Sequence, residues 1–150
     1  AVHKRSGNVF VATTALPAGA ATITDVAMDP DNDQIVFAVD DNQVFRSING
    51  GSTWTDVTGN LGSISSFDFR TIEFIPDGNN DSVVLGTRSG VYSAAVNSST
   101  WALFGSGLPN VLVFDLRYVA SNQTLYAGTL GRGVWSTTVT SDNLFRNGFE

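Results

Sequence analysis

The stretch NQVFRSINGGSTW (residues 42–54) returns further along the chain as SGVYSAAVNSSTW (residues 89–101) and, shortened, as GRGVWSTTV (residues 131–139). The aromatic residue after the valine is Phe45, Tyr92 and Trp135 in turn, and these residues fall 47 and 43 positions apart. Self-similarity at a fixed period of 20–50 residues is the sequence signature of repeat architectures. We therefore expect one structural unit, written several times along the chain.

Each unit contains four short stretches with the character of β-strands. The first stretch alternates large apolar residues with others, a polar loop follows, and a second apolar run comes next. The third stretch is the valine–aromatic one, and the fourth starts at Trp54 or Trp101. Four short strands per unit with turns between them predict the blades of a β-propeller, an all-β fold of four-stranded antiparallel blades.

The two ends of the chain are incomplete units. Val9 precedes Leu16 by seven residues, as Trp54 precedes Leu61, so residues 8–17 look like an outermost strand that lacks its blade. The last unit has three strands and no fourth. We expect about three blades over residues 1–140, followed by a tail over 141–150; the pieces are an outer strand (8–17), two blades (23–61 and 69–108) and a three-stranded partial blade (113–139).

Three blades do not close a ring, because propellers use roughly four to eight. An open ring leaves sheet edges and faces without partners, which proteins rarely tolerate. Two explanations stay open. The chain is the C-terminal portion of a longer propeller with other blades, or a second copy of the chain pairs with it and each first strand completes the other's last blade.

The turn SINGGSTW (residues 47–54) resembles the Asp-box, S-x-D-x-G-x-T-W, of sialidase-like (BNR) propellers, xyloglucanases, sortilin-type receptors and plant photosystem assembly factors. Asn49 stands where that family has aspartate. The resemblance implies a structural hairpin, away from the active site in that family, with the box residues Ser47, Asn49, Gly51, Thr53 and Trp54. Short polar side chains suit such a turn because they hydrogen-bond nearby backbone, and glycine supplies positive φ.

Composition limits the kinds of partner. The formal net charge is -6, and the 8 lysines and arginines are scattered, so we expect no nucleic acid as partner. No apolar run approaches the roughly 18–20 residues that cross a bilayer, so we expect no membrane span. The ending NLFRNGFE (residues 143–150) resembles the F-x-x-G-F-E terminus of many secreted proteobacterial proteins. This resemblance implies a bacterial protein that is secreted or lies at the cell surface.

Metal and nucleophile chemistry find little support. Asp29, Asp31 and Asp33 alternate as in a calcium loop, with Asp40 further on, but the glycine and the terminal glutamate of such a loop are missing. The single histidine is His3, and the chain has no cysteine, so a serine–histidine nucleophile and a zinc site lack their residues. We expect no metal and no other cofactor.

Charged residues on the innermost strands are the candidates for function, since these strands line the central channel of a propeller. Asp25 and Asp115 occupy equivalent positions and are candidate catalytic acids, with Thr71 between them and with Asp68 and Glu73 on or near the second inner strand. Arg70 and Arg117 are candidates for gripping a ligand carboxylate, whereas Arg88 and Arg132 are expected on the surface.

The sequence does not decide whether the chain is an enzyme. We favour a binding or structural module of an exported protein that recognises a glycan or a protein at the propeller face. One alternative is part of a glycoside hydrolase of the sialidase-like or xyloglucanase-like type. A further alternative is a self-assembling extracellular protein that exchanges strands between chains.

Overall fold

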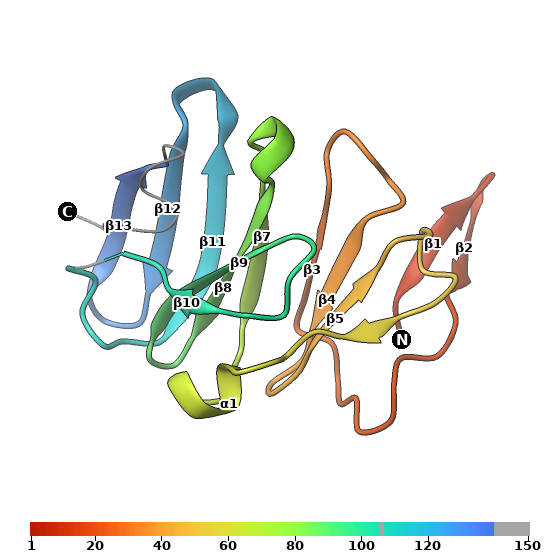
Figure 1. Ribbon diagram of the computed structural model, residues 1–150, viewed down its shortest axis with the longest axis horizontal. Helices are drawn as coiled ribbons and strands as arrows, with labels where there is room; N and C mark the ends of the chain where they lie inside the picture. Colours follow the sequence, from red (N-terminus) through yellow and green to blue (C-terminus); the bar gives the residue numbers. More distant parts are fainter. Residues whose placement is uncertain (106, 140–150) are drawn as a thin grey trace.

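The computed structural model describes residues 1–105 and 107–139, and almost all of its regular structure is antiparallel β-sheet. The predicted tail over 141–150 lies outside the described residues. Figure 1 shows the sheets standing side by side along the chain, with the hairpin of β1 and β2 at one end and β13 at the other. The expected all-β fold of propeller blades in an incomplete ring is confirmed.

Two of the sheets have four strands that follow one another in sequence order. The first sheet lies within the predicted range 23–61 and consists of β3 (Asp25–Met28), β4 (Val36–Val39), β5 (Val44–Ser47) and β6 (Thr55–Asp56). The second lies within 69–108 and consists of β7 (Thr71–Ile75), β8 (Ser82–Thr87), β9 (Gly90–Ala95) and β10 (Ala102–Leu103). Every neighbouring pair in them is antiparallel, as the short turns between the strands require.

The third sheet has three strands and lies within the predicted range 113–139. Its strands are β11 (Val113–Val119), β12 (Thr124–Thr129) and β13 (Gly133–Thr138). Short helical turns join the elements: α1 (Leu61–Ile64) lies between the first and second sheets, and two 3-10 turns, Gly78–Asn80 and Ala120–Asn122, follow β7 and β11. No helix among the described residues is long and apolar enough to cross a membrane.

The N-terminal hairpin differs from the expectation of a lone outer strand over 8–17. The strand is shorter, β2 (Val9–Ala12), and it pairs with β1 (His3–Ser6), a strand that the sequence pattern does not predict. Gly7 takes a φ of 60°, so residues 7 and 8 form a two-residue turn of the kind that joins twisted strands. All eight residues of the hairpin strands are exposed.

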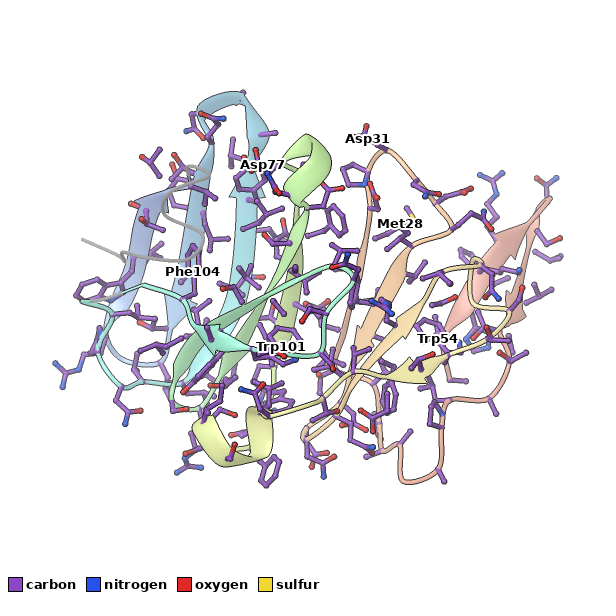
Figure 2. All side chains as sticks on the ribbon, in the orientation of Figure 1. Met28, Asp31, Trp54, Asp77, Trp101 and Phe104 are labelled. Atoms are coloured by element: carbon purple, nitrogen blue, oxygen red, sulfur yellow. The ribbon has the colours of Figure 1, made fainter. Side chains whose placement is uncertain are left out.

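The hydrophobic core lies between the sheets. One cluster joins the first sheet to the second and includes Phe37, Ile72 and Trp101; the other joins the second to the third and includes Val84, Phe104 and Leu125. The Trp101 indole N–H donates to the carbonyl oxygen of Val57, 2.9 Å away, so this large side chain is buried without an unsatisfied donor. Figure 2 labels Trp101 and Phe104, which stand directly before and after β10.

At Gly59 the backbone lies in close contact with Ser99, in the segment that precedes β10. The φ of Gly59 is 53°, and a Cβ atom there would collide with the carbonyl oxygen of Ser99. Gly78 has a similar φ of 63° but has open space around its Cα. The two glycines therefore separate the cost of the backbone conformation from the cost of the close approach.

We predict that Gly59→Ala destabilises the chain by at least about 2 kcal/mol more than Gly78→Ala, because only the first substitution adds a collision with backbone to the strain of a left-handed residue. Gly78→Ala should cost about 1 kcal/mol. Urea unfolding followed by tryptophan fluorescence measures both values. Equal losses in the two variants would contradict the packing of residue 59 against Ser99.

Candidate functional site

The innermost strands β3, β7 and β11 lie next to one another and are joined through side chains. The Asp25 carboxylate on β3 accepts a hydrogen bond from the Thr71 hydroxyl at 2.8 Å and another from the Ile72 backbone N–H at 3.0 Å, both on β7. Its other oxygen accepts from the Val26 backbone N–H at 2.8 Å. Asp25 therefore links the first sheet to the second.

The same kind of link is repeated between the second sheet and the third. The Thr71 hydroxyl oxygen accepts from the Leu116 N–H at 3.3 Å, and the Glu73 carboxylate accepts from the Tyr118 N–H at 2.9 Å. In each case a side chain of one inner strand receives a backbone N–H of the next. We call these three contacts, Asp25–Ile72, Thr71–Leu116 and Glu73–Tyr118, the inter-blade rungs.

Glu73 is the inner-strand acid whose protonation the fold perturbs. Burial between two sheets raises its pKa above the usual 4.5, and the charges of Asp25 and Asp115 add to that rise. The Tyr118 N–H and the Arg117 guanidinium act in the opposite direction because both favour the ionised form. Desolvation is the dominant effect.

Asp115 and Arg117 lie on the side of β11 that faces away from the second sheet. They form an ion pair with 3.7 Å between Arg117 Nε and Asp115 Oδ1, and both side chains are largely exposed. Leu116 and Tyr118, which alternate with them, belong to the core against the second sheet. The structure therefore puts this pair on the open face of the last sheet.

A second group of charged residues surrounds Asp68, in the segment that leads into β7. Arg70 forms an ion pair with Asp68, Arg88 Nη1 lies 4.0 Å from the same carboxylate, and the Arg70 guanidinium carbon lies 6.0 Å from the centroid of the Phe114 ring. We call Asp68, Arg70, Arg88 and Phe114 the Asp68 cluster. It joins one carboxylate, two cations and an aromatic face at one site.

The backbone of Asp68 is strained. Its φ is 84°, a left-handed value that non-glycine residues seldom adopt, and the N–H groups of Asp68 and Phe69 both donate to the Asp41 carbonyl oxygen, at 2.8 and 3.0 Å. Such residues persist only where the surrounding structure determines them, and they concentrate at functional sites. The two hydrogen bonds from the β4–β5 turn hold Asp68 in this conformation.

The candidates named from the sequence therefore separate into three places. Asp25 belongs to an inter-blade rung, Arg70 to the Asp68 cluster, and Asp115 with Arg117 to the open face. Arg88, expected as a plain surface residue, is exposed but reaches the Asp68 carboxylate. The order of strands could have predicted this contact. In a blade of antiparallel strands, the turn between the second and third strands lies at the same end as the start of the inner strand, so Arg88 and Asp68 belong to one end of the second blade.

The turn over residues 47–54 lies at the other end of β5 from the Asp41 turn. Ser47 Oγ accepts from the Gly51 N–H at 2.8 Å, and Asn49 Oδ1 accepts from the Thr53 N–H at 2.8 Å. The Asn49 side-chain amide donates to Thr53 Oγ1 at 2.8 Å, a bond that an aspartate could not donate. Gly50 and Gly51 have φ values of 61° and 81°, and Trp54 follows the turn. These contacts are internal to the hairpin.

Among residues 1–105 and 107–139, no group of three histidine, cysteine, aspartate or glutamate side chains could hold a metal ion. The Asp29 carboxylate instead accepts from the Asp31 N–H at 2.9 Å, and Asp40 accepts from the N–H groups of Ala21, Asn42 and Gln43. These acidic side chains stabilise turns.

No protein-family model matches the chain, and no curated protein matches its sequence. Among solved structures, it is similar to an ancestral GH74 enzyme (22% identity, TM-score 0.60, 86% of this chain and 20% of that one). It is also similar to YCF48 bound to D1 peptide, with 13% identity and a TM-score of 0.65 over 96% of this chain and 44% of that one. A third similar structure is the extracellular domain of the putative hybrid two-component system BT4673 from B. thetaiotaomicron. It has 13% identity and a TM-score of 0.60 over 92% of this chain and 17% of that one.

These likenesses show the fold alone, that of a β-propeller. The chain spans less than half the length of each of the three structures. Its sheets therefore correspond to a few blades of larger propeller chains.

We predict that Asp25→Ala lowers the free energy of unfolding by about 1–3 kcal/mol, because it leaves the Ile72 N–H and the Thr71 hydroxyl without their acceptor. Asp33→Ala is the matched control, since the exposed Asp33 carboxylate accepts only from the neighbouring Gln34 side chain among the described contacts. Urea unfolding of both variants measures the difference. A cost for Asp25→Ala no larger than that of the control would show that the rung contributes nothing to stability.

Glu73 gives a prediction in pH. Because its folded pKa is raised, its favourable contribution is complete below the unfolded value of about 4.5 and is lost as pH rises through the folded pKa. Glu73→Gln keeps an acceptor for the Tyr118 N–H and removes the ionisation. We expect its melting temperature to exceed that of the original chain at pH 7 and to match it near pH 4. A difference independent of pH would contradict the assignment.

Proposed function

We propose that this chain is a ligand-binding propeller module of an exported protein and that it recognises a glycan at the end of the blades that carries the Asp68 cluster. The observation that carries the proposal is the cluster itself, in which a strained aspartate fixes an arginine close to an exposed aromatic ring. A protein ligand at the same face is the other outcome of the test.

The chemistry of the cluster suits a hydroxylated ligand. A guanidinium and a carboxylate already paired with each other still offer donors and acceptors to neighbouring hydroxyl groups. Phe114 and Phe67 are both about half exposed and give apolar surfaces on which the C–H face of a sugar ring can pack. Because Asp68 offsets one of the two positive charges of Arg70 and Arg88, we take a neutral oligosaccharide as the ligand and a strongly anionic one as the comparison.

The relatives in structure support a binding module in general terms. One is described as a GH74 enzyme, another as bound to a peptide and a third as an extracellular domain. The resemblance of residues 47–54 to the Asp-box and of the tail to secreted proteobacterial termini supports the Asp-box family and export. Ligands of propellers commonly reach the ends of the inner strands, where Arg70 and Phe114 lie.

Binding is favoured over hydrolysis by the contacts of the two candidate acids. Glycosidases place two carboxyl groups about 5–9.5 Å apart across one scissile bond. Asp25 accepts hydrogen bonds from Thr71, Ile72 and Val26, and Asp115 pairs with Arg117 on the open face. The catalytic roles of Asp25 and Asp115 stay a prediction.

Titration of the isotope-labelled chain with xyloglucan oligosaccharides, followed by amide NMR, tests the proposal, with a sialylated trisaccharide as the anionic comparison. We expect shifts around Arg70, Arg88 and Phe114 with the neutral sugar. Arg70→Ala and Phe114→Ala should each weaken binding at least tenfold, since each removes a principal contact. Phe10→Ala, which removes an exposed aromatic ring on β2, is the control and should bind unchanged.

Shifts confined to other surfaces, or binding that survives both substitutions, would contradict the site. Absence of sugar binding combined with binding of peptides at Arg70 and Phe114 would replace the glycan with a protein ligand. Absence of either kind of binding at these residues would overturn the proposed function.

A further inference from the structure

β2 occupies the position of a fourth strand in front of the first sheet. Thr14 lies two residues after β2, and its N–H and hydroxyl donate to the Gly51 carbonyl at 3.2 and 3.0 Å, while the hydroxyl also reaches the Ser52 carbonyl at 3.0 Å. By the alignment of Val9 with Trp54 and of Phe45 with Tyr92, the positions equivalent to Thr14 and Ser52 one blade further on are Gly59 and Ser99. That pair is also in close contact.

Among residues 1–105 and 107–139, no strand fills the inner part of that blade position. A cleft of about 800 Å³ lies between β1 and the first sheet and is lined by β1, Val26, Met28 and Val36. Val26 and Met28 are 50% and 55% exposed, whereas their equivalents on the second sheet, Ile72 and Phe74, are 1% and 5% exposed because the first sheet covers them. Figure 2 labels Met28 in this region.

The other end of the chain presents the complementary surface. Among the described residues the last sheet has three strands, and β13 is its outermost one. On its open face Val134 is 72% exposed, whereas the equivalent Val91 of the second sheet is fully buried against the next sheet. Tyr126 and Val119 are likewise partly exposed where Val84 and Ile75 are buried.

Asp115 extends the pattern of inter-blade rungs. It is equivalent to Asp25 and Thr71, each of which accepts the N–H of the residue that follows the equivalent position on the next inner strand. The matching N–H at the start of the series belongs to Val26, and among the described contacts it donates to Oδ1 of its own neighbour Asp25. One chain therefore carries both halves of a further rung.

We propose that the sheet β11–β13 of one copy docks into the cleft of a second copy, so that Asp115 accepts the Val26 N–H of its neighbour. β11 and β12 take the two empty inner positions. β13 then replaces β1 as the partner of β2. β2 gives up its four residue pairs with the exposed strand β1 and pairs instead with the edge of β13, which is six residues long. The contact residues Asp115 and Val26 are not members of the Asp68 cluster, so the proposal goes beyond the proposed function.

Two copies joined in this way form a closed ring. Each copy contributes two complete blades, and each of the two contacts builds one composite blade from β11–β13 of one chain and β2 of the other. Six blades lie within the range of roughly four to eight that propellers use. Closed head-to-tail contacts give rings, whereas contacts that do not close give filaments.

The chain has no cysteine, so introduced cysteines report this contact directly. Asp115→Cys combined with Val26→Cys should give, on oxidation, a species of twice the 15.9 kDa chain mass that reverts on reduction. Val9→Cys with Asp115→Cys is the matched control and should cross-link little, because β2 and β11 lie at opposite edges of the composite blade. Asp25→Cys combined with Ile72→Cys should form a disulfide within one chain, which verifies that the geometry of a rung allows cross-linking.

Light scattering on the unmodified chain measures its mass in solution as concentration is raised. We expect twice the chain mass. We also expect at least a tenfold weaker association for Met28→Asp than for Ile48→Asp, an apolar site that is somewhat more exposed and does not line the cleft. A monomer at all concentrations up to about 200 μM, or cross-linking of Asp115→Cys/Val26→Cys no greater than the control, would overturn the proposal. Sugar binding measured on that monomer would still test the proposed function separately.

Discussion

The inter-blade rungs are the constraint on which the rest of the structure depends. Each inner strand is the edge strand of its sheet, so the backbone N–H groups on its free edge have no partner strand in that sheet. A buried donor without a partner is costly. Asp25, Thr71 and Glu73 satisfy such donors on the neighbouring blade. The rungs fix the register of one blade against the next, and the apolar clusters between the sheets pack in that register.

This arrangement explains why carboxylates on inner strands are poor guides to catalysis here. Asp25 looks like a channel acid in the sequence, yet its oxygens are engaged by hydrogen bonds to β3 and β7. Glu73 lies deeper, and burial raises its pKa. The residues that can meet a ligand belong to the segments that enter the inner strands, where Asp68 is strained and Phe114 is exposed.

Much of the fold could be predicted because blades repeat local features. The alternation in residues 69–76, the valine–aromatic strands and the tryptophans at the fourth strand are all short-range patterns. β1 was missed because its sequence, HKRS, carries no apolar alternation and depends on pairing with β2. The Asp68 cluster was missed because it joins residues from three separate segments that only tertiary structure brings together.

Trp54 and Trp101 show how the neighbouring element changes the surroundings of one position of the repeat. The Trp101 N–H finds the Val57 carbonyl and its ring is buried between two sheets, whereas Trp54 is less buried and its Nε1 has no hydrogen-bond partner in the structure. The two residues occupy the same place in the repeat. Their difference comes from what lies in front of each blade, which is a complete sheet for Trp101 and a two-stranded hairpin for Trp54.

Amide hydrogen exchange measured by NMR tests the central claim most directly. We predict slow exchange for the N–H groups of Ile72, Leu116 and Tyr118, comparable with exchange in the interior strands β4 and β8. In Asp25→Ala, exchange at Ile72 should accelerate while exchange at Tyr118 stays slow. Rapid exchange at all three amides in the unmodified chain, or no response of Ile72 to loss of Asp25, would contradict the claim that side chains of one blade hold the backbone of the next.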